Sequence, residues 1–387
     1  MFSDRIRNQN GSALLICLML LGLLGLLAMS VADQTHTDIE MSFNQVHEDQ
    51  AFYLAEAGLS RAIGELNDSV EWRDGFDREV MGDGFFTVIV TDSATDSTLD
   101  DTIMVLSTGG VQSAKSSIEA LIGPEYYQPF RSAMFGKSLV DMRNSFTTDS
   151  YRSDSGSYAA TWNDMDGDVG SNGIVDADNG TVVGGSVSTS LTDGLDINAG
   201  ATINGTSTDE APENPLVEIP QAEFDWAALN NDNLTGISGT YTYNTSTDAF
   251  KADDTVTFTS GVYYFSSITL TNTASIILAP GAEVVFYVTG DIELKNSSEL
   301  NPTGDPNDLM IFSQGDFVLK NSGDMHVLFY NPNGDADLRN SGDFYGSIVA
   351  DNIYAHNSAG FHYDRTLSDI EWDDIVGYDL LAWKETY

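Results

Sequence analysis

Residues 12–32 read SALLICLMLLGLLGLLAMSVA and contain no charged side chain. A run of about 20 apolar residues is long enough to cross the hydrocarbon core of a bilayer as an α-helix. The preceding segment, residues 1–11, carries Arg5 and Arg7. Because Lys and Arg are enriched on the cytoplasmic side of such helices, we expect residues 1–11 to be cytoplasmic and the remainder to be exported.

The helical pattern continues beyond the apolar run. From Asp33 onward no glycine occurs before Gly58 and no proline before Pro124. Apolar residues recur at helical spacing, namely Ile39, Phe43, Val46, Phe52, Ala55, Leu59, Ala62 and Leu66. We therefore predict one helix over residues 12–66, with a transmembrane half (12–32) and an amphipathic half. The alternative is a cleavable secretory signal that ends at the small residues Ser30 and Ala32.

Two segments of this helix resemble a known family. Gly11-Ser12-Ala13-Leu14-Leu15 is similar to the type III signal that prepilin peptidase cuts, here between Gly11 and Ser12. Ala55-Glu56-Ala57-Gly58 resembles the AEAG segment of the PilX-type N-terminal family of type IV pilus minor pilins. The resemblance covers about residues 5–66. It implies prepilin peptidase, the inner membrane and other pilins as partners.

The sequence departs from major pilins at one position. Major pilins carry a glutamate at the fifth mature position, where this sequence has Ile16. An unpaired carboxylate is costly in lipid, and a subunit that docks on no other subunit has no need of one. The resemblance therefore implies a minor subunit that primes the filament or lies at its tip.

Residues 67–125 are expected to form a small β module. Within them, residues 85–90, 102–107 and 116–122 read as three strands separated by glycine- and aspartate-rich turns. Three strands packed on the exposed half of the long helix would form a pilin-like α+β unit.

Residues 126–387 change in composition and repeat internally. Asn-Ser steps begin at Asn296, Asn321, Asn340 and Asn357, spaced by 25, 19 and 17 residues, with a looser copy at Asn272. This spacing suits one coil of a β-solenoid, in which Gly-Asp and Asn-Ser provide turns and the five asparagines form a ladder. Inward-facing apolar residues would then be Ile292, Leu294, Phe317, Leu319 and Leu338. A β-sandwich is the alternative.

The same region is similar to an uncharacterised polar-repeat domain that follows PilX-like N-termini. The residues that carry this resemblance are 148–158, 167–173, 261–264 and 382–385. It implies surface placement and no assigned activity. The predicted fold class is therefore α+β: a long pilin-like helix with a small antiparallel sheet, then an all-β, right-handed β-solenoid-like domain. We expect an insertion near residues 205–245, with a short helix over 222–230.

Candidate metal and catalytic residues are few. Asp164, Asp166 and Asp168 are spaced like the start of a calcium loop, but Val175 occupies the position of the closing glutamate. An ordinary acidic turn is therefore favoured, and calcium is the only cofactor considered. The five histidines form no metal motif, and the sequence lacks nucleophile-elbow, Walker and dinucleotide patterns. We expect no enzymatic activity.

The charge excludes one class of partner. With 16 basic and 59 acidic residues, the net charge is −43. Nucleic-acid binding needs clustered cations, so we exclude it. The single cysteine, Cys17, excludes a disulfide within the exported part.

These observations predict a minor pilin-like component of a type IV pilus or related filament. It would be a single-pass inner-membrane protein that displays an acidic solenoid at the cell surface or pilus tip, for assembly or adhesion. The alternative is a membrane-anchored adhesin or carbohydrate-binding protein outside any pilus. Its surface or glycan ligand would stack on aromatic residues drawn from Tyr126, Tyr127, Tyr263, Tyr264, Phe329, Tyr330 and Tyr345.

Overall fold

The computed structural model describes residues 9–339, 341–356 and 359–386, with side chains from Leu14 onward. The chain divides into two compact units. The smaller unit comprises residues 1–126 and 375–387, and the larger unit comprises residues 127–374. Each is described by itself.

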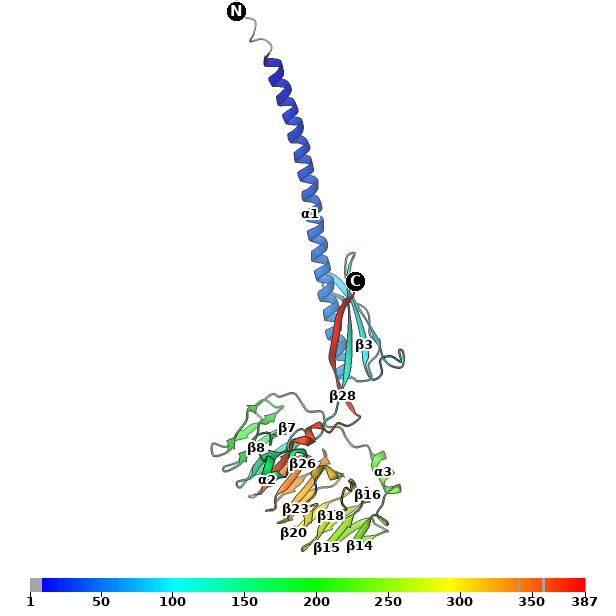
Figure 1. The fold of residues 1–387 in the computed structure, drawn as a ribbon, viewed down its shortest axis with the longest axis vertical. Coiled ribbons are helices and arrows are strands. Elements are labelled where there is room, and N and C mark those ends of the chain that lie inside the picture. Colours follow the sequence, from blue (N-terminus) through cyan, green and yellow to red (C-terminus); the bar gives the residue numbers. More distant parts are fainter. Residues whose placement is uncertain (1–8, 340, 357–358, 387) are drawn as a thin grey trace, which may run out of the picture. The chain divides into compact units, whose positions relative to one another are not determined.

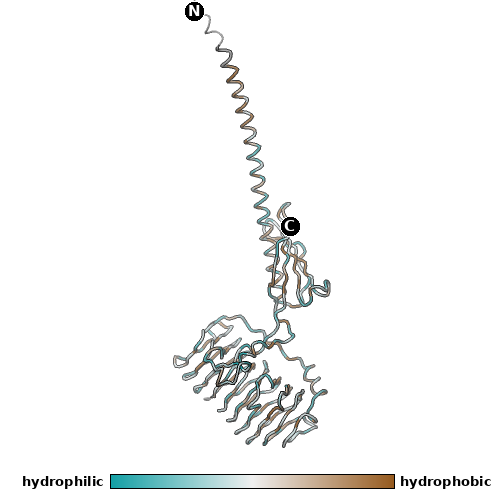
Figure 2. Tube along the Cα trace, viewed as in Figure 1, coloured by the Kyte–Doolittle hydropathy of each residue, from teal (hydrophilic) through white to brown (hydrophobic). Residues whose placement is uncertain are grey.

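Helix α1 (Gln9–Asp68) of the smaller unit is one unbroken α-helix of 60 residues, as predicted for residues 12–66. At 1.5 Å per residue it is about 90 Å long. The side chains of residues 14–46 are exposed, and Figure 2 shows the N-terminal part of the helix as hydrophobic. By length and composition this part can cross a membrane.

The C-terminal part of α1 packs on a sheet through one stripe. The stripe consists of Ala51, Ala55, Leu59, Ala62 and Leu66, all buried. Ile39, Phe43 and Val46, which we expected to belong to the packed side of the helix, are 49%, 60% and 47% exposed. At 100° per residue they lie on the face opposite the buried stripe, so that stripe alone packs on the sheet.

The sheet of the smaller unit contains the three predicted strands and two more. Its order is β1-β2-β3-β4-β28, and every neighbouring pair is antiparallel. The strands are β1 (Phe76–Met81), β2 (Gly84–Thr91), β3 (Ile103–Val111), β4 (Ala114–Tyr126) and β28 (Ile375–Thr386).

Strand β28 corrects the predicted domain boundary. Residues 126–387 were expected to form one solenoid domain, but β28 pairs with β4 instead. Asn67 accepts a hydrogen bond from the Tyr378 backbone N–H at 2.7 Å, which ties β28 to the end of α1. The solenoid therefore ends at Asp374, and the chain returns to the smaller unit.

The larger unit is a β-solenoid of stacked parallel strands (Figure 1), as predicted. Its described strands form one 23-stranded sheet; the right-handed sense of the coil stays a prediction. The strands of its first part are β5 (Met134–Arg143), β6 (Thr147–Tyr151), β7 (Val169–Ser171), β8 (Ile174–Ala177), β9 (Val182–Val183), β10 (Val187–Thr189), β11 (Leu195–Ile197), β12 (Thr202–Ile203) and β13 (Ser207–Thr208).

The second part begins with an antiparallel pair, β14 and β15, and then continues in parallel coils. Its strands are β14 (Ile237–Asn244), β15 (Ala249–Phe258), β16 (Gly261–Phe265), β17 (Ser267–Leu270), β18 (Ser275–Leu278), β19 (Val284–Val288), β20 (Ile292–Asn296), β21 (Glu299–Leu300), β22 (Leu309–Ser313), β23 (Phe317–Asn321), β24 (Met325–Asn331), β25 (Ala336–Leu338), β26 (Phe344–His356) and β27 (Gly360–Asp364).

The coils do not stack in chain order. The first coil, β5–β6, pairs with β7, β8 and β9 on one side. On its other side it pairs with the last coil, because β5 pairs with β26 and β6 with β27. The first and last coils of the larger unit therefore meet inside the stack, along a junction that we call the seam.

The core is a narrow apolar column, and all five predicted inward residues are buried. In-register aromatic rings add stacking, as in Phe344 and Phe361, whose centroids are 4.5 Å apart. The predicted short helix is α3 (Gln221–Leu229) within the insertion. Phe224 and Ala227 of α3 pack near Tyr287, so the helix covers an outward apolar face of the coils.

Candidate functional site

The AEAG segment lies where α1 meets its sheet. Ala55 and Gly58 are buried, whereas Glu56 is exposed. A Cβ atom at Gly58 would collide with the Ser107 hydroxyl and lie 2.9 Å from the Phe86 ring. Ala55 and Gly58 therefore let the helix approach the sheet closely, and packing accounts for both residues. Gly11 and Ser12 lie within α1, in the part whose side chains are not described.

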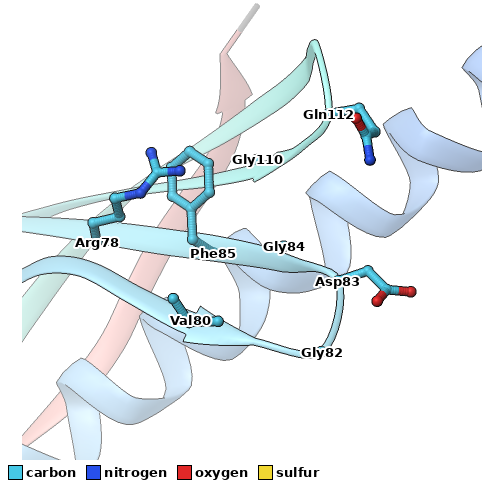
Figure 3. A pocket seen from close by; sticks show the side chains of 8 residues that line it. All are labelled: Arg78, Val80, Gly82, Asp83, Gly84, Phe85, Gly110 and Gln112. Atoms are coloured by element: carbon cyan, nitrogen blue, oxygen red, sulfur yellow. The ribbon is translucent and has the colours of Figure 1, made fainter.

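A shallow pocket of about 420 Å³ lies beside the β1–β2 turn of the smaller unit (Figure 3). Its clearest feature is the guanidinium of Arg78, whose Cζ lies 3.8 Å from the centroid of the Phe85 ring. Gly84, Gly110 and Gln112 also line it. The pocket contains one acid, Asp83, and no pair of groups suited to proton transfer.

Three of the five asparagines of the predicted ladder are described, and their backbone carbonyl groups link successive coils. The carbonyl groups of Asn272, Asn296 and Asn321 accept hydrogen bonds from Ser297, Ser322 and Ser341, at 2.8, 2.7 and 3.0 Å. Asn272 and Asn296 have φ of 60° and 63°, in the left-handed region that asparagine tolerates. Asn321 is instead buried, and its Nδ2 donates to the Ser298 carbonyl at 2.8 Å. Asn340 and Asn357 lie outside the described residues.

An aspartate ladder, which we did not predict, follows another corner. Oδ1 of Asp291 accepts a hydrogen bond from the backbone of Asp316, and Oδ1 of Asp316 accepts one from Asp335, both at 3.1 Å. Each carboxylate thus satisfies a backbone donor of the next coil. The Gly-Asp steps of the repeat are therefore explained by turn geometry.

The three aspartates that are spaced like the start of a calcium loop do not share one centre. Asp166 Oδ2 is 3.3 Å from Nη1 of Arg365, and Asp168 Oδ1 accepts a hydrogen bond from the Ser186 backbone at 2.6 Å. Asp164 is exposed. The three carboxylates have separate partners or face solvent, and no group of three His, Cys, Asp or Glu side chains in the described part of the chain is arranged to hold a metal ion.

A cluster of titratable side chains lies at the seam. His326, Tyr345, His362 and Asp149 occupy equivalent positions of four successive strands, β24, β26, β27 and β6. The rings of His326 and Tyr345 are stacked, with centroids 4.2 Å apart and planes 3° apart. His362 Nδ1 lies 2.7 Å from Oδ1 of Asp149. Parallel in-register pairing thus builds a column of two imidazoles, a phenol and a carboxylate.

The excursion between β6 and β7 covers this column. It contains the short helices η1 (Ser153–Ser155) and α2 (Tyr158–Thr161). The hydroxyl of Tyr158 and the indole N–H of Trp162 both donate to Oδ2 of Asp149 at 2.8 Å. The ring of Tyr158 also lies 4.3 Å from that of His362, measured between centroids.

A pocket of about 330 Å³ opens beside the column, between that excursion and the one that contains η2 (Pro306–Asp308). The rings of Tyr151, Tyr158 and Tyr345 are mutually edge-to-face, with centroids 5.4–6.0 Å apart and planes 83–85° apart. The remaining lining residues are Ser153, Gly156, Ser157, Thr303, Gly304, Asp305, Pro306 and His326. This volume is in the range of small-ligand sites.

The histidines of the column have opposite pKa shifts. Burial lowers the pKa of His326 to about 4, so its imidazole is neutral near pH 7. Burial also opposes protonation of His362, but the hydrogen bond to Asp149 and the nearby carboxylate of Asp343 outweigh it and raise its pKa. Burial, together with the charges of Asp343, Asp324 and Asp149, raises the pKa of Tyr345 to about 12.

Tyr345 is one of the seven aromatic residues that the sequence offered for ligand stacking. The structure distinguishes these seven by their burial and by whether they line the pocket. Tyr127, Tyr263, Phe329 and Tyr330 are buried. Tyr345 alone among the seven lines this pocket within the described residues. Tyr151, Tyr158 and His326 were missed, because they come together only through the register of distant strands. The repeat could have identified His326, which follows the Asn321 step by five residues as Tyr345 follows the Asn340 step, whereas Tyr151 and Tyr158 lie outside the repeat.

Comparisons with known proteins give limited matches. A family model described as a domain of unknown function (DUF7305) matches residues 268–370. No curated protein is significantly similar in sequence.

Three solved structures are similar to parts of the chain. The competence-associated pilin ComZ from Thermus thermophilus is 13% identical, with 88% of this chain and 97% of that chain covered and a TM-score of 0.36. The ice-binding protein from the Antarctic ascomycete Antarctomyces psychrotrophicus is 12% identical, with 62% and 98% covered and a TM-score of 0.34. A glycosylated ice-binding protein from an Arctic yeast is also 12% identical, with 65% and 97% covered and a TM-score of 0.35. At such low TM-scores these likenesses assign no function to the chain.

Proposed function

We propose that the protein is a minor pilin-like component of a type IV pilus or related filament. Helix α1 would anchor it in the inner membrane and then pack among the helices of other pilins. The solenoid would be displayed outside the cell, at the surface or at the filament tip, for assembly or adhesion. We assign it no catalytic activity.

The observation that carries this proposal is an exposed apolar stripe that continues along α1 beyond the membrane segment. Ile39, Phe43, Val46 and Tyr53 are 47–65% exposed. At 100° per residue they lie on one face of the helix, roughly opposite the face of Ala55 and Leu59 that packs on the sheet. An anchor that only tethered a domain would not need an apolar stripe there, whereas a helix that packs against neighbouring helices would.

The tip location is the finer part of the proposal. It rests on Ile16, which is exposed on α1 where a major pilin would carry a glutamate. A subunit with an apolar residue there can begin or end a filament without leaving a carboxylate unpaired in lipid. The resemblance to the PilX-type family points in the same direction.

Processing at Gly11 tests the proposal. In a host with the matching peptidase, mass spectrometry of the mature protein should find Ser12 as the first residue. The variant Gly11→Ala should stay uncut, and neighbouring Asn10→Ala is the matched control that should be processed normally. A mature protein that begins at Met1 would support the fixed-anchor adhesin instead. A start near Asp33 would show that the apolar segment is discarded, and would refute both membrane-anchored models.

Incorporation is the second measurement. Phe43→Asp places a charge in the exposed stripe without touching the sheet, so cleavage should persist while recovery in sheared filaments falls. Glu40→Gln, on a neighbouring exposed position, should be recovered at the normal level. Equal recovery of the two variants would argue against packing of this helix face in a filament.

A further inference from the structure

The pocket beside the seam has an unusual wall. Three of its lining side chains are the mutually perpendicular tyrosines 151, 158 and 345, and a fourth is the imidazole of His326. No lysine or arginine lines it, and its one charged lining residue is Asp305. Aromatic faces carry negative electrostatic potential. The tyrosine rings and the Asp305 carboxylate therefore both favour a positively charged ligand.

The surroundings strengthen this negative field. Asp364 is fully buried beside Tyr151, to which it is paired across β6 and β27, and its Oδ2 has no hydrogen-bond partner among the described residues. After burial, Asp364 and Asp305 are the main causes that raise the pKa of the Tyr151 hydroxyl. A field that opposes a phenolate will also attract a cation. Across the column, the positive charge of the protonated His362 is offset by the two carboxylates of Asp149 and Asp343.

We propose that this pocket binds an organic ammonium cation, with its alkyl groups against the tyrosine rings and its charge near Asp305. A trimethylammonium or similar headgroup combines an apolar shell with a delocalised positive charge, which suits aromatic walls better than it suits water. The proposal concerns the solenoid alone and goes beyond the filament role, which makes no use of this pocket.

Other ligand classes fit the wall less well. An anion would meet Asp305 and the buried Asp364 without any lining cation to balance them. A neutral saccharide could stack on a tyrosine and donate hydroxyl hydrogen bonds to Asp305, but it has no charge for the negative field to attract. An inorganic metal ion favours several converging carboxylate or imidazole ligands, and among the lining residues only Asp305 and the neutral His326 carry such a group.

Calorimetric titration with choline chloride tests the proposal. The full chain would be kept in a polyoxyethylene detergent, which contains neither an ammonium group nor a sugar. Sodium chloride at matched ionic strength corrects for non-specific screening, which is strong for a protein of net charge −43. We expect saturable choline binding, and none with glucose or maltose.

Three variants locate the site. Tyr345→Leu should weaken choline binding about tenfold, through loss of one ring face. Asp305→Asn should weaken it about fivefold, while its side chain can still accept the hydrogen bond from the Asn307 backbone. Tyr354→Leu changes another partly exposed tyrosine of the same strand, outside the pocket, and should bind choline like the unaltered protein.

Folding of each variant is checked by its far-ultraviolet circular dichroism. If Tyr345→Leu fails to fold, Asp305→Asn still tests the site, because it leaves all the aromatic rings in place. Absence of saturable choline binding at millimolar concentrations would overturn the proposal. So would binding that the Asp305→Asn variant leaves unchanged, or saccharide binding that depends on Tyr345 in place of choline binding. Because the titration needs no filament, its failure would leave the processing result at Gly11 unaffected.

Discussion

The Nδ1 atom of His362 lies 2.7 Å from Oδ1 of Asp149, and this ion pair closes the seam between the last and first coils of the solenoid. The other ring nitrogen, Nε2, lies 3.8 Å from Oδ2 of Asp343. His362 is only 7% exposed. A buried imidazole between two carboxylates is stabilised in its protonated form, and removal of the ring leaves both acids without that partner.

The first prediction is that His362→Gln destabilises the larger unit most at low pH. The pKa of His362 is raised above its ordinary value of 6.5. Its stabilising contribution is therefore complete below that value and is lost as pH rises through the raised pKa. We expect a cost of about 3 kcal/mol at pH 6 and a smaller one at pH 9. Urea unfolding followed by tryptophan fluorescence measures it, with the exposed His36→Gln as control. A cost that does not vary with pH would contradict the assignment.

The second prediction concerns His326, whose shift has the opposite sign. Its pKa is lowered to about 4 by burial, so the unfolded chain binds a proton that the folded chain refuses. Stability is therefore lost as pH falls from about 6.5 to 4, by about 3 kcal/mol. Nδ1 of His326 is also buried without a partner among the described residues.

The variant His326→Phe keeps an aromatic ring stacked on Tyr345. It removes both the group that gains a proton on unfolding and the buried nitrogen that has no partner. The variant should be about 1 kcal/mol more stable at pH 7.5, since an unpartnered buried nitrogen is gone. Its advantage should grow toward pH 4. Unfolding of both proteins across this range tests the prediction, and parallel stability curves would contradict it. His326→Leu separates the loss of the nitrogen from retention of the stacked ring.

The local parts of this fold could be predicted from sequence, whereas its long-range pairings could not. The spacing of Ala55, Leu59 and Ala62 correctly marked the buried stripe of α1. The repeat likewise marked Ile292 and Phe317 as core residues, because strand periodicity fixes which side chains face inward. Strand β28 was assigned to the wrong unit, since alternation along a strand does not reveal its partner.

The seam and its pocket were beyond sequence reasoning for the same reason. His326, Tyr345 and His362 are 19 and 17 residues apart, which is the spacing of the Asn-Ser steps at residues 321, 340 and 357, so the repeat aligned these three residues but gave no sign of Asp149 beside them. The repeat is clear only in the second part of the solenoid, so the coils of residues 134–208 gave no register. Pairing of β27 with β6, far apart in the chain, places Asp149 beside His362.

The third prediction uses two glycines of α1 in different surroundings. Gly58→Ala should destabilise the smaller unit by about 2 kcal/mol, because a new Cβ would strike Ser107 and crowd Phe86. Gly64→Ala should stabilise it by about 0.5–1 kcal/mol, since Gly64 has open space around its Cα and alanine favours the helix. Thermal unfolding of the full chain in detergent compares the two. Equal effects would mean that the helix does not approach the sheet as closely as described.

The last prediction separates two asparagines that occupy the same register position. Asn296 pairs with Asn321 across β20 and β23, but only Asn296 has a positive φ, of 63°. Asn296→Ala should therefore cost about 1 kcal/mol, and Asn296→Gly should cost almost nothing, because glycine adopts this conformation without strain.

Glycine should not rescue the second position. Asn321 is buried, and its Nδ2 donates to the carbonyl groups of Ser298 and Gly323, at 2.8 and 3.1 Å. Asn321→Gly loses both bonds and leaves both acceptors unpaired, so we expect a cost of about 2 kcal/mol. The free energy of unfolding in urea is compared for alanine and glycine variants at both positions, Asn296 and Asn321. If glycine and alanine are equivalent at Asn296, backbone conformation is not what selects asparagine at this position.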